Sequence, residues 1–348
     1  MRDVLEVDGL LITDTFNLNY LVGFTGGGTD GAVLVGLDKA VLITDGRYTE
    51  AYQNNLPDGV EFSETREYYD RAVELTKEWG VKKLGFEEGV PFNIFDRIDE
   101  ALDDDIDFLP TPSPVEALRE IKDDDEVAAI QVAIDKSITA YELLLKQIKI
   151  GMTERQVVNL LDAIAREQGL QKASFDVIVA SGINSSKPHA TATDRELQNG
   201  DFVTIDWGYY LNGYTSDLTR TFGIGDVDDK LKNIYQIVLD AQLKQVAAAG
   251  PDMPMNKLDA IGRDIITEAG FGKEFNHGTG HGFGLNIHET PYIQNRFDNP
   301  TVVGNIITIE PGIYVSGLGG VRIEDDLLIT KDGSKNLTGK LAKDLIIL

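Results

Sequence analysis

The stretch that decides the fold of this chain is Asn276-His277-Gly278-Thr279-Gly280-His281-Gly282-Phe283-Gly284-Leu285-Asn286-Ile287-His288-Glu289. The chain has four histidines, three of which fall here, and glycine occupies four of the seven positions from 278 to 284. Glycine lets a backbone approach another group closely or adopt φ angles that other residues avoid. Histidines among such glycines indicate a site in preference to a glycine-rich loop with incidental histidines. A phosphate-binding loop is disfavoured, because neither a Gly-Lys-Ser/Thr ending nor a βαβ context follows.

A predicted β-hairpin between residues 201 and 222 carries two aspartates upstream of this stretch. Its turn is Asn212-Gly213, a pair that favours tight hairpins. In that register Asp206 faces Thr219. Asp206 and Asp217 then share one face as diagonal neighbours, about 7–8 Å apart at Cα. Two solvated surface aspartates are the alternative, which the apolar run before Asp206 disfavours.

Two glutamates occupy similar apolar surroundings downstream. Glu310 closes an apolar run, and Glu324 lies in a strand predicted from Val321 to Ile329. Side-chain alternation puts Arg322, Glu324 and Asp326 on one face of that strand. Each acid alone is more typical of a structural role than of catalysis. Together they repeat one pattern, in which acids are set on strands that otherwise belong to a core.

Burying the four carboxylates of Asp206, Asp217, Glu310 and Glu324 without compensating charge would be prohibitive. Two divalent cations would neutralise them, with His281 as a nitrogen ligand. Oxygen ligands with one imidazole suit Mn²⁺, Co²⁺, Fe²⁺ or Zn²⁺, and a thiolate site is excluded because the chain has no cysteine. Ions in such a pair lie about 3.5–4 Å apart and can activate a bridging water as hydroxide. The sequence therefore predicts a dinuclear hydrolytic site.

Composition limits the partners of the chain. Its formal net charge of -26 excludes nucleic acid and anionic membranes, because phosphate binding needs clustered Lys and Arg. No apolar run is long enough to span a membrane. The first residues, Met1–Asp8, lack the basic-then-apolar layout of a signal peptide, so we expect a cytoplasmic protein.

The length of 348 residues and the order of the expected elements predict two domains. Residues 1–120 alternate short β-prone runs with helical spacing, which is typical of a small α/β domain. Pro110, Pro112 and Pro114 mark its boundary. In residues 121–348 a pair of helices followed by strands occurs twice, which suggests an internal duplication. The helices are expected at roughly 125–150, 153–169, 229–249 and 256–269, the second opened by the capping box Thr153-Glu154-Arg155-Gln156.

These motifs resemble the pita-bread metallopeptidases, which are prolidase, aminopeptidase P and, more distantly, methionine aminopeptidase. The resemblance covers residues 120–348 densely. It implies an N-terminal creatinase-like α/β domain at 1–120 and a catalytic α+β pita-bread domain with pseudo-twofold duplication at 121–348. The matching stretches are Pro188-His189-Ala190, Ile205–Gly208, Thr215–Arg220, Gly278–Glu289, Ile309–Tyr314 and Gly320–Asp325.

The resemblance also implies a role for each metal ligand. Asp206 would hold one metal ion, and His281 would hold the other together with Glu310. Asp217 and Glu324 would bridge both ions. Glu310 would in addition be the general base toward the bridging water.

Four further residues would act around the metals by resemblance. His189, His277 and His288 would contact the substrate and stabilise the tetrahedral intermediate. Arg322 would support the metal ligands and the proline end of the substrate. A surface histidine is the alternative for His189, which the neighbouring Ser-Ser-Lys-Pro stretch at 185–188 disfavours.

The implied activity is hydrolysis of an Xaa-Pro bond at the N-terminus of a peptide, through a metal-bridging hydroxide. Creatinase lacks the full metal set, whereas all five ligands are present here. Asn19–Gly26 and Thr44–Tyr48 resemble aminopeptidase P more than prolidase, although the length fits compact prolidases. We therefore predict an Xaa-Pro aminopeptidase, with an Xaa-Pro dipeptidase as the alternative and a non-catalytic peptide- or protein-binding module as a remote one.

The resemblance extends to cofactor and partners. The expected cofactor is a pair of divalent ions, Mn²⁺ first, with Co²⁺ or Zn²⁺ as alternatives. The expected partners are peptides with proline in the second position and a second copy of the chain in a homodimer.

Overall fold

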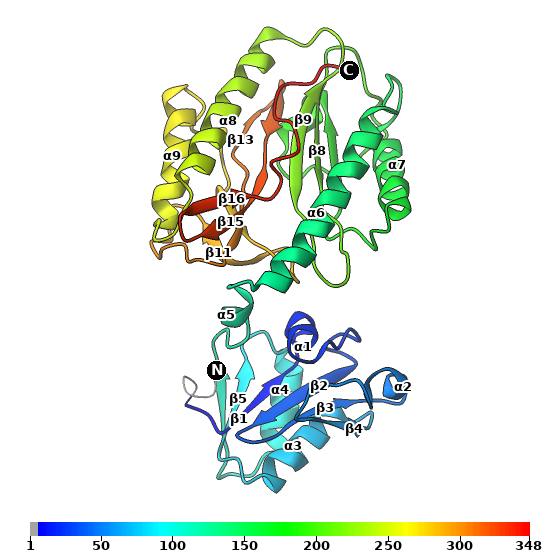
Figure 1. The fold of residues 1–348 in the computed structure, drawn as a ribbon, viewed down its shortest axis with the longest axis vertical. Coiled ribbons are helices and arrows are strands. Elements are labelled where there is room, and N and C mark those ends of the chain that lie inside the picture. Colours follow the sequence, from blue (N-terminus) through cyan, green and yellow to red (C-terminus); the bar gives the residue numbers. More distant parts are fainter. Residues whose placement is uncertain (1–5) are drawn as a thin grey trace. The chain divides into compact units, whose positions relative to one another are not determined.

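The computed structural model describes residues 6–348 and divides into two compact units, one ending at Arg119 and one spanning Glu120–Leu348 (Figure 1). Within the described residues no helix is both long and apolar enough to cross a membrane. Each unit has its own apolar core. The two units are therefore described separately.

The N-terminal unit is built on a six-stranded mixed sheet of order β4-β3-β2-β1-β5-β6. Its strands are β1 (Gly9–Ile12), β2 (Gly31–Gly36), β3 (Ala40–Thr44), β4 (Val60–Glu64), β5 (Lys83–Glu87) and β6 (Asp107–Thr111). Its helices are α1 (Thr15–Val22), α2 (Thr49–Tyr52), α3 (Tyr68–Glu78), α4 (Phe92–Ala101) and α5 (Glu116–Arg119).

Helices cover both faces of this sheet, which explains why its central strands are continuously apolar. Leu11 of β1 belongs to the core that contains residues of α3 and α4, whereas its neighbour Leu10 belongs to the core that contains residues of α1. The predicted α/β class of this unit is confirmed. Pro110, which we expected near a boundary, lies within β6, where an edge strand tolerates proline.

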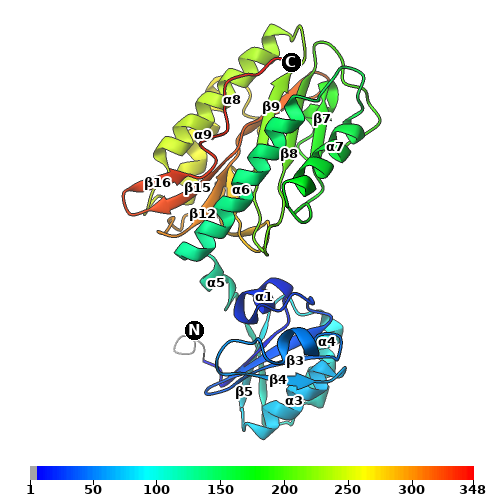
Figure 2. The same ribbon diagram turned by 45° about the vertical axis from the view of Figure 1, so that its right-hand side comes forward.

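The C-terminal unit contains two long helix pairs that flank its strands (Figures 1 and 2). The first pair is α6 (Asp124–Leu145) and α7 (Glu154–Glu167), and the second is α8 (Asp229–Ala248) and α9 (Met255–Glu268). The capping box predicted at Thr153 and Gln156 opens α7. The predicted duplication is confirmed, because each helix pair is followed by strands that pack against it.

Three small sheets complete this unit, with strand orders β7-β8-β9, β13-β14 and β11-β10-β12-β15-β16. The first contains β7 (Ile178–Ser181), β8 (Phe202–Trp207) and β9 (Leu218–Gly223), and a 3₁₀ helix, Gly182–Ser186, follows β7. The others contain β10 (Gly280–Gly282), β11 (Glu289–Ile293), β12 (Ile306–Ile309), β13 (Gly312–Val315), β14 (Gly319–Arg322), β15 (Asp325–Thr330) and β16 (Gly333–Asn336).

The predicted hairpin is present in the predicted register. Asp206 pairs with Thr219, and the turn residues Asn212 and Gly213 have φ angles of 51° and 91°. The pairing of β8 with β9 stops after Trp207 and Leu218, and it resumes at the Leu211–Tyr214 bridge beside the turn. A Cβ on Gly208 would lie 2.2 Å from the carbonyl oxygen of Ser216, so glycine permits the close backbone crossing there.

The prediction of a single strand from Val321 to Ile329 is wrong. The chain leaves β14 after Arg322 and enters a different sheet at Asp325, with Glu324 between the two strands. The backbone amide of Glu324 donates to the carbonyl of Thr219 at 3.1 Å. This cross-sheet bond, which periodicity cannot reveal, brings Glu324 beside the hairpin.

Candidate metal centre and active site

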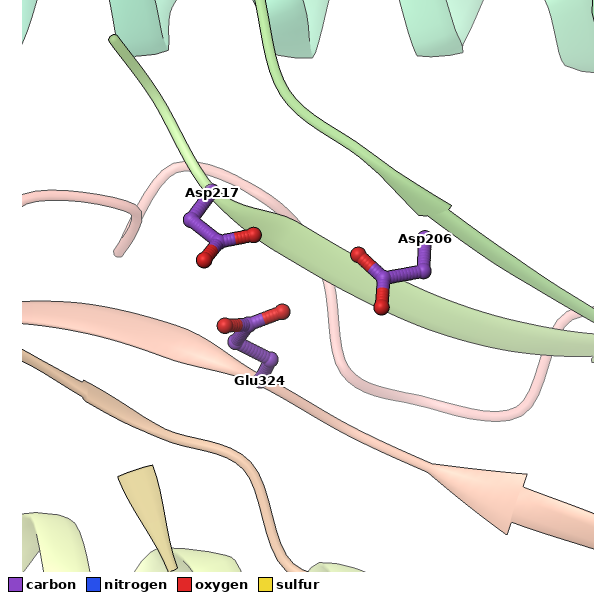
Figure 3. Close-up of side chains that lie close together, drawn as sticks. All are labelled: Asp206, Asp217 and Glu324. Atoms are coloured by element: carbon purple, nitrogen blue, oxygen red, sulfur yellow. The ribbon is translucent and has the colours of Figure 1, made fainter. Parts of the chain in front are cut away.

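Three carboxylates from distant parts of the chain meet in the C-terminal unit. Asp206 lies on β8, Asp217 directly precedes β9, and Glu324 lies between β14 and β15. One oxygen from each lies within 4.8 Å of the others, and the three side chains point toward a common space (Figure 3). Asp217 and Glu324 are buried, with exposed fractions of 5% and 1%. This arrangement matches the predicted cluster of acids on core strands.

The histidine-rich stretch reaches the same space because its glycines allow close strand packing. A Cβ on Gly280 would lie 2.0 Å from the carbonyl oxygen of Thr308 in β12, and one on Gly282 would lie 2.3 Å from that of Thr290 in β11. Strand β10 can therefore lie between β11 and β12 only with glycine at positions 280 and 282. His281 is the side chain that this strand presents.

The imidazole of His281 is oriented for metal binding. Its Nδ1 lies 3.0 Å from the carbonyl oxygen of Gly282, which can only accept a hydrogen bond, so Nδ1 carries the hydrogen and donates. Its Nε2 therefore has a free lone pair, 3.4 Å from Oε1 of Glu310 and 3.6 Å from Oδ2 of Asp217. Burial, with His288 nearby, lowers the pKa of His281 to about 4, so the ring is neutral at pH 7.

Without a cation, the ionised form of these carboxyl groups is unfavourable. Burial, reinforced by Asp206, raises the pKa of Asp217 well above its usual value. Burial and the neighbouring Asp217 do the same to Glu324, and burial raises the pKa of Glu310 against the opposing effect of Arg322. The Oδ1 atom of Asp206 is buried without a hydrogen-bond partner. Oxygen ligands, one imidazole and an unsatisfied carboxylate oxygen fit divalent cations of the kind predicted.

One arginine connects the candidate metal ligands to the surrounding chain. These ligands, called the metal cluster below, are Asp206, Asp217, His281, Glu310 and Glu324. Arg322 donates from Nη2 to Asp206 at 2.5 Å, from Nε to the Thr219 hydroxyl at 3.1 Å, and from Nη1 to the Tyr314 hydroxyl at 2.8 Å. Its Nη1 also lies 3.3 Å from the carbonyl oxygen of Pro188. Because four of its donors are occupied by the protein, Arg322 is held rigidly against Asp206.

His277 is linked to this arginine through Tyr314. Its Nε2 lies 2.9 Å from the Tyr314 hydroxyl, and its Nδ1 lies 2.8 Å from the carbonyl oxygen of Gly278. The carbonyl fixes the hydrogen on Nδ1, so Tyr314 donates to Nε2 and accepts from Arg322. Burial and Arg322 lower the pKa of His277 to about 3, and burial raises the pKa of Tyr314 to about 12.

A cleft of about 800 Å³ contains all nine residues that the sequence singled out. His288 lies beside the metal cluster, with its ring centroid 4.5 Å from that of His281. His189 is exposed on the loop that follows β7. Residues of α7 and of the segment before β7 also line the cleft. The nine residues, which make up part of the lining, are Asp206, Asp217, His189, His277, His281, His288, Glu310, Arg322 and Glu324.

Sequence reasoning missed three side chains that contact the site. The Thr219 hydroxyl donates to Glu324 at 2.8 Å, and the Thr308 hydroxyl donates to Glu310 at 3.2 Å. Thr308 could have been found, because it lies two residues before Glu310 and so shares its face of the strand. Tyr314 gave no such signal, since its role depends on a contact across the fold.

Comparison with known proteins agrees with this geometry. Residues 128–331 match the model of metallopeptidase family M24, and residues 3–121 match the creatinase/prolidase N-terminal domain. An Xaa-Pro dipeptidase from Pyrococcus horikoshii is 35% identical over 99% of this chain and 96% of its own.

Two solved structures are also similar over nearly the whole chain. An Xaa-Pro dipeptidase from Bacillus anthracis is 42% identical, with a TM-score of 0.94 over 98% of this chain and 95% of its own. An X-Pro aminopeptidase from Thermotoga maritima is 33% identical, with a TM-score of 0.91 over 100% and 99%. The chain belongs to metallopeptidase family M24, so the predicted enzyme class, a divalent-metal peptidase, and the pita-bread fold are confirmed.

Proposed function

We propose that this protein hydrolyses the Xaa-Pro bond at the N-terminus of peptides as an Xaa-Pro aminopeptidase. The observation that carries the proposal is the cluster of Asp206, Asp217 and Glu324 in the lining of the cleft, with the free Nε2 of His281 3.6 Å from Oδ2 of Asp217. Relatives named for Xaa-Pro cleavage support the substrate class.

The metal-binding roles in this proposal are those that the family resemblance implies. Asp217 and Glu324 would each hold both ions, Asp206 would hold one of them, and His281 with Glu310 would hold the other. When bound, the two ions lower the pKa of a water molecule and polarise the scissile carbonyl. We propose Mn²⁺ as the native ion because oxygen ligands predominate, with Co²⁺ or Zn²⁺ as alternatives.

The remaining chemistry belongs to side chains around the metals. Glu310 accepts a proton from the attacking water and returns it to the proline nitrogen as the carbon–nitrogen bond breaks. The products are a free Xaa carboxylate and a peptide that begins with proline. His288, next to His281, is placed to stabilise the oxyanion that develops on the Xaa carbonyl.

Three groups orient the substrate in this proposal. His189 would contact the peptide from the loop after β7, and His277 would contact it from the segment before β10, since both line the cleft. Arg322 keeps Asp206 in its ligating orientation and faces the proline end. Neutral His277 and protonated Tyr314 keep their hydrogen-bonding roles over the physiological pH range.

Metal removal and restoration test the proposal. Treatment with a chelator should abolish cleavage of Ala-Pro-Yaa peptides, and readdition of Mn²⁺ or Co²⁺ should restore it. A protein that gains no activity with any divalent ion would instead support the non-catalytic peptide-binding module.

An Xaa-Pro dipeptidase is the second candidate, favoured by the names of several relatives. Parallel kcat/KM measurements on Ala-Pro and Ala-Pro-Ala decide between the two. A strong preference for the dipeptide would replace the aminopeptidase assignment without affecting the metal chemistry.

We also propose a homodimer and a cytoplasmic location, the former from the family resemblance. Light scattering tests the dimer, and fractionation of the source cells tests the location.

The division at residue 120 is proposed as a true domain boundary, supported by the two compact units. Limited proteolysis should cut near it if this proposal holds.

A further inference from the structure

A buried glutamate outside the metal cluster holds a loop of the active site. Glu154, the first residue of α7, has an exposed fraction of 0%. Helix α7 lies beside β7 in the C-terminal unit (Figure 2). The chain that leaves β7 forms a loop over residues 181–193, which includes His189 and then returns to the start of α7.

The Glu154 carboxylate accepts hydrogen bonds from both ends of this loop. At the first end, Oε1 accepts from the backbone amide and hydroxyl of Ser181 at 2.8 and 2.7 Å. At the other end, Oε2 accepts from the backbone amide and hydroxyl of Thr193 at 2.9 and 2.6 Å. The side-chain amide of Asn184 contributes a fifth donor, 3.1 and 3.2 Å from the two oxygens.

The loop held in this way reaches the catalytic cleft. Pro188 and His189 line the cleft, and the Pro188 carbonyl lies 3.3 Å from Nη1 of Arg322. Ser185 accepts from the backbone amide of Gly320 in β14 at 2.8 Å. The loop therefore has attachments on its far side as well. Glu154 joins its two ends through four hydrogen bonds, and Arg195 adds one to each end, from Nη1 to the Ser181 hydroxyl at 2.7 Å and from its backbone amide to the Thr193 hydroxyl at 3.1 Å.

We infer that Glu154 is a positioning residue that sets the place of His189 in the cleft by fixing both ends of the 181–193 loop. Glutamine cannot replace the carboxylate, because one of its two terminal groups is a donor that would face the donors of Ser181 or Thr193. The inference rests on the proposed function only in taking His189 as a substrate contact.

The variant Glu154→Gln tests this inference, with Glu167→Gln on the exposed end of the same helix as the matched control. For Glu154→Gln we expect kcat for an Xaa-Pro peptide to fall roughly 10- to 100-fold, because small displacements of a positioned group are costly. The Mn²⁺ content should be unchanged, since Glu154 has no contact with the metal cluster. Thr193→Val removes only one of the hydroxyl donors to Glu154 and should give a smaller loss of kcat. This variant still tests the inference if Glu154→Gln does not fold.

A double-mutant cycle with His189→Ala separates positioning from general destabilisation. If Glu154 acts through His189, adding Glu154→Gln to His189→Ala should lower kcat little further. Losses that multiply would overturn the inference, as would an unchanged kcat in Glu154→Gln.

A spectroscopic measurement keeps the inference independent of the proposed function. The chain has four histidines, so its imidazole carbon–proton NMR signals can be assigned by single substitutions in the Zn²⁺-loaded protein. Glu154→Gln, or Thr193→Val if the former does not fold, should shift the His189 signal, whereas Glu167→Gln should not. An unmoved His189 signal would overturn the inference, while a full activity of His189→Ala with a shifted signal would count only against the proposed role of His189.

Discussion

The hydroxyl of Tyr314 lies 2.9 Å from Nε2 of His277 and 2.8 Å from Nη1 of Arg322. It accepts from the arginine and donates to the histidine, so one tyrosine connects an imidazole that lines the cleft to the guanidinium that holds Asp206. The direction of each hydrogen bond is fixed, because the Gly278 carbonyl occupies the other nitrogen of the imidazole.

Tyr314→Phe should therefore reduce catalysis without removing metal. Loss of the hydroxyl removes two buried hydrogen bonds and leaves Arg322 and His277 each with an unsatisfied group, at a cost of about 1–3 kcal/mol per group. We expect kcat/KM to fall roughly tenfold or more while the Mn²⁺ content stays the same. Tyr235→Phe is the control, because this buried tyrosine loses a single bond to the Lys343 carbonyl away from the cleft. Equal activity in the two variants would show that the Tyr314 link does not contribute to turnover.

The division between metal ligands and substrate contacts predicts different metal contents. Asp217→Asn and Glu324→Gln should each lose metal together with activity, because each removes a proposed bridging carboxylate from a space shared by three acids. His277→Ala and His288→Ala should keep more metal and lose turnover. Elemental analysis of the four purified variants is the measurement, and equal metal loss in all four would refute the assignment.

Much of this site was predictable because it depends on local rules. The register that pairs Asp206 with Thr219 follows from the Asn212-Gly213 turn, and the structure contains it. The glycines around His281 also have the expected cause, which is close packing of β10 between its neighbours. Strand periodicity and turn chemistry act over a few residues, so one sequence is sufficient to apply them.

Apart from the local contact of Thr308 with Glu310, the contacts that the sequence did not predict are those that cross the fold. Glu154 was part of a predicted capping box, and nothing in that motif indicates that its side chain joins Ser181 to Thr193. The second half of the duplication contains a comparable arrangement that was also missed. Asp259 on α9 accepts from Thr279 at 3.0 Å and pairs with Arg263, which donates to the carbonyls of Phe275 and His277.

His277 should also make the protein sensitive to acid. Its pKa is lowered to about 3 in the folded state, from an ordinary 6.5 in the unfolded state. The unfolded chain therefore binds more protons between these values, so the contribution is complete above pH 6.5 and is lost as the pH falls toward 3. At pH 5 the loss should be about 1–2 kcal/mol of unfolding free energy.

Comparison of the wild type with His277→Asn isolates this effect from other titrating groups. Urea unfolding at pH 7.5 and pH 5, with chelator present, gives the four free energies that are needed. The difference in unfolding free energy between the wild type and the variant should be smaller at pH 5 than at pH 7.5. A difference that is the same at both pH values would show that His277 does not remain neutral in the folded protein.

The last prediction concerns the residue after the scissile bond. Proline contributes no N–H to an Xaa-Pro amide and has a fixed φ angle, so a pocket for its ring need not satisfy an amide donor. His277, His288 and Arg322 are the candidates to shape that pocket, and all three line the cleft beside the metal cluster. Arg322 has most of its donors occupied by Asp206, Thr219, Tyr314 and Pro188, so it offers a fixed surface more than a flexible partner.

Matched peptides that differ only in this residue measure the effect of proline directly. We expect Ala-Pro-Ala to be cleaved with a kcat/KM at least roughly a hundredfold above that of Ala-Ala-Ala, since the alanine amide would bring an unpaired donor into the site. The metal content and the protein concentration are the same in both assays, so only the substrate changes. Comparable kcat/KM values would make the protein a general aminopeptidase, and the proline assignment would fall while the metal assignment stood.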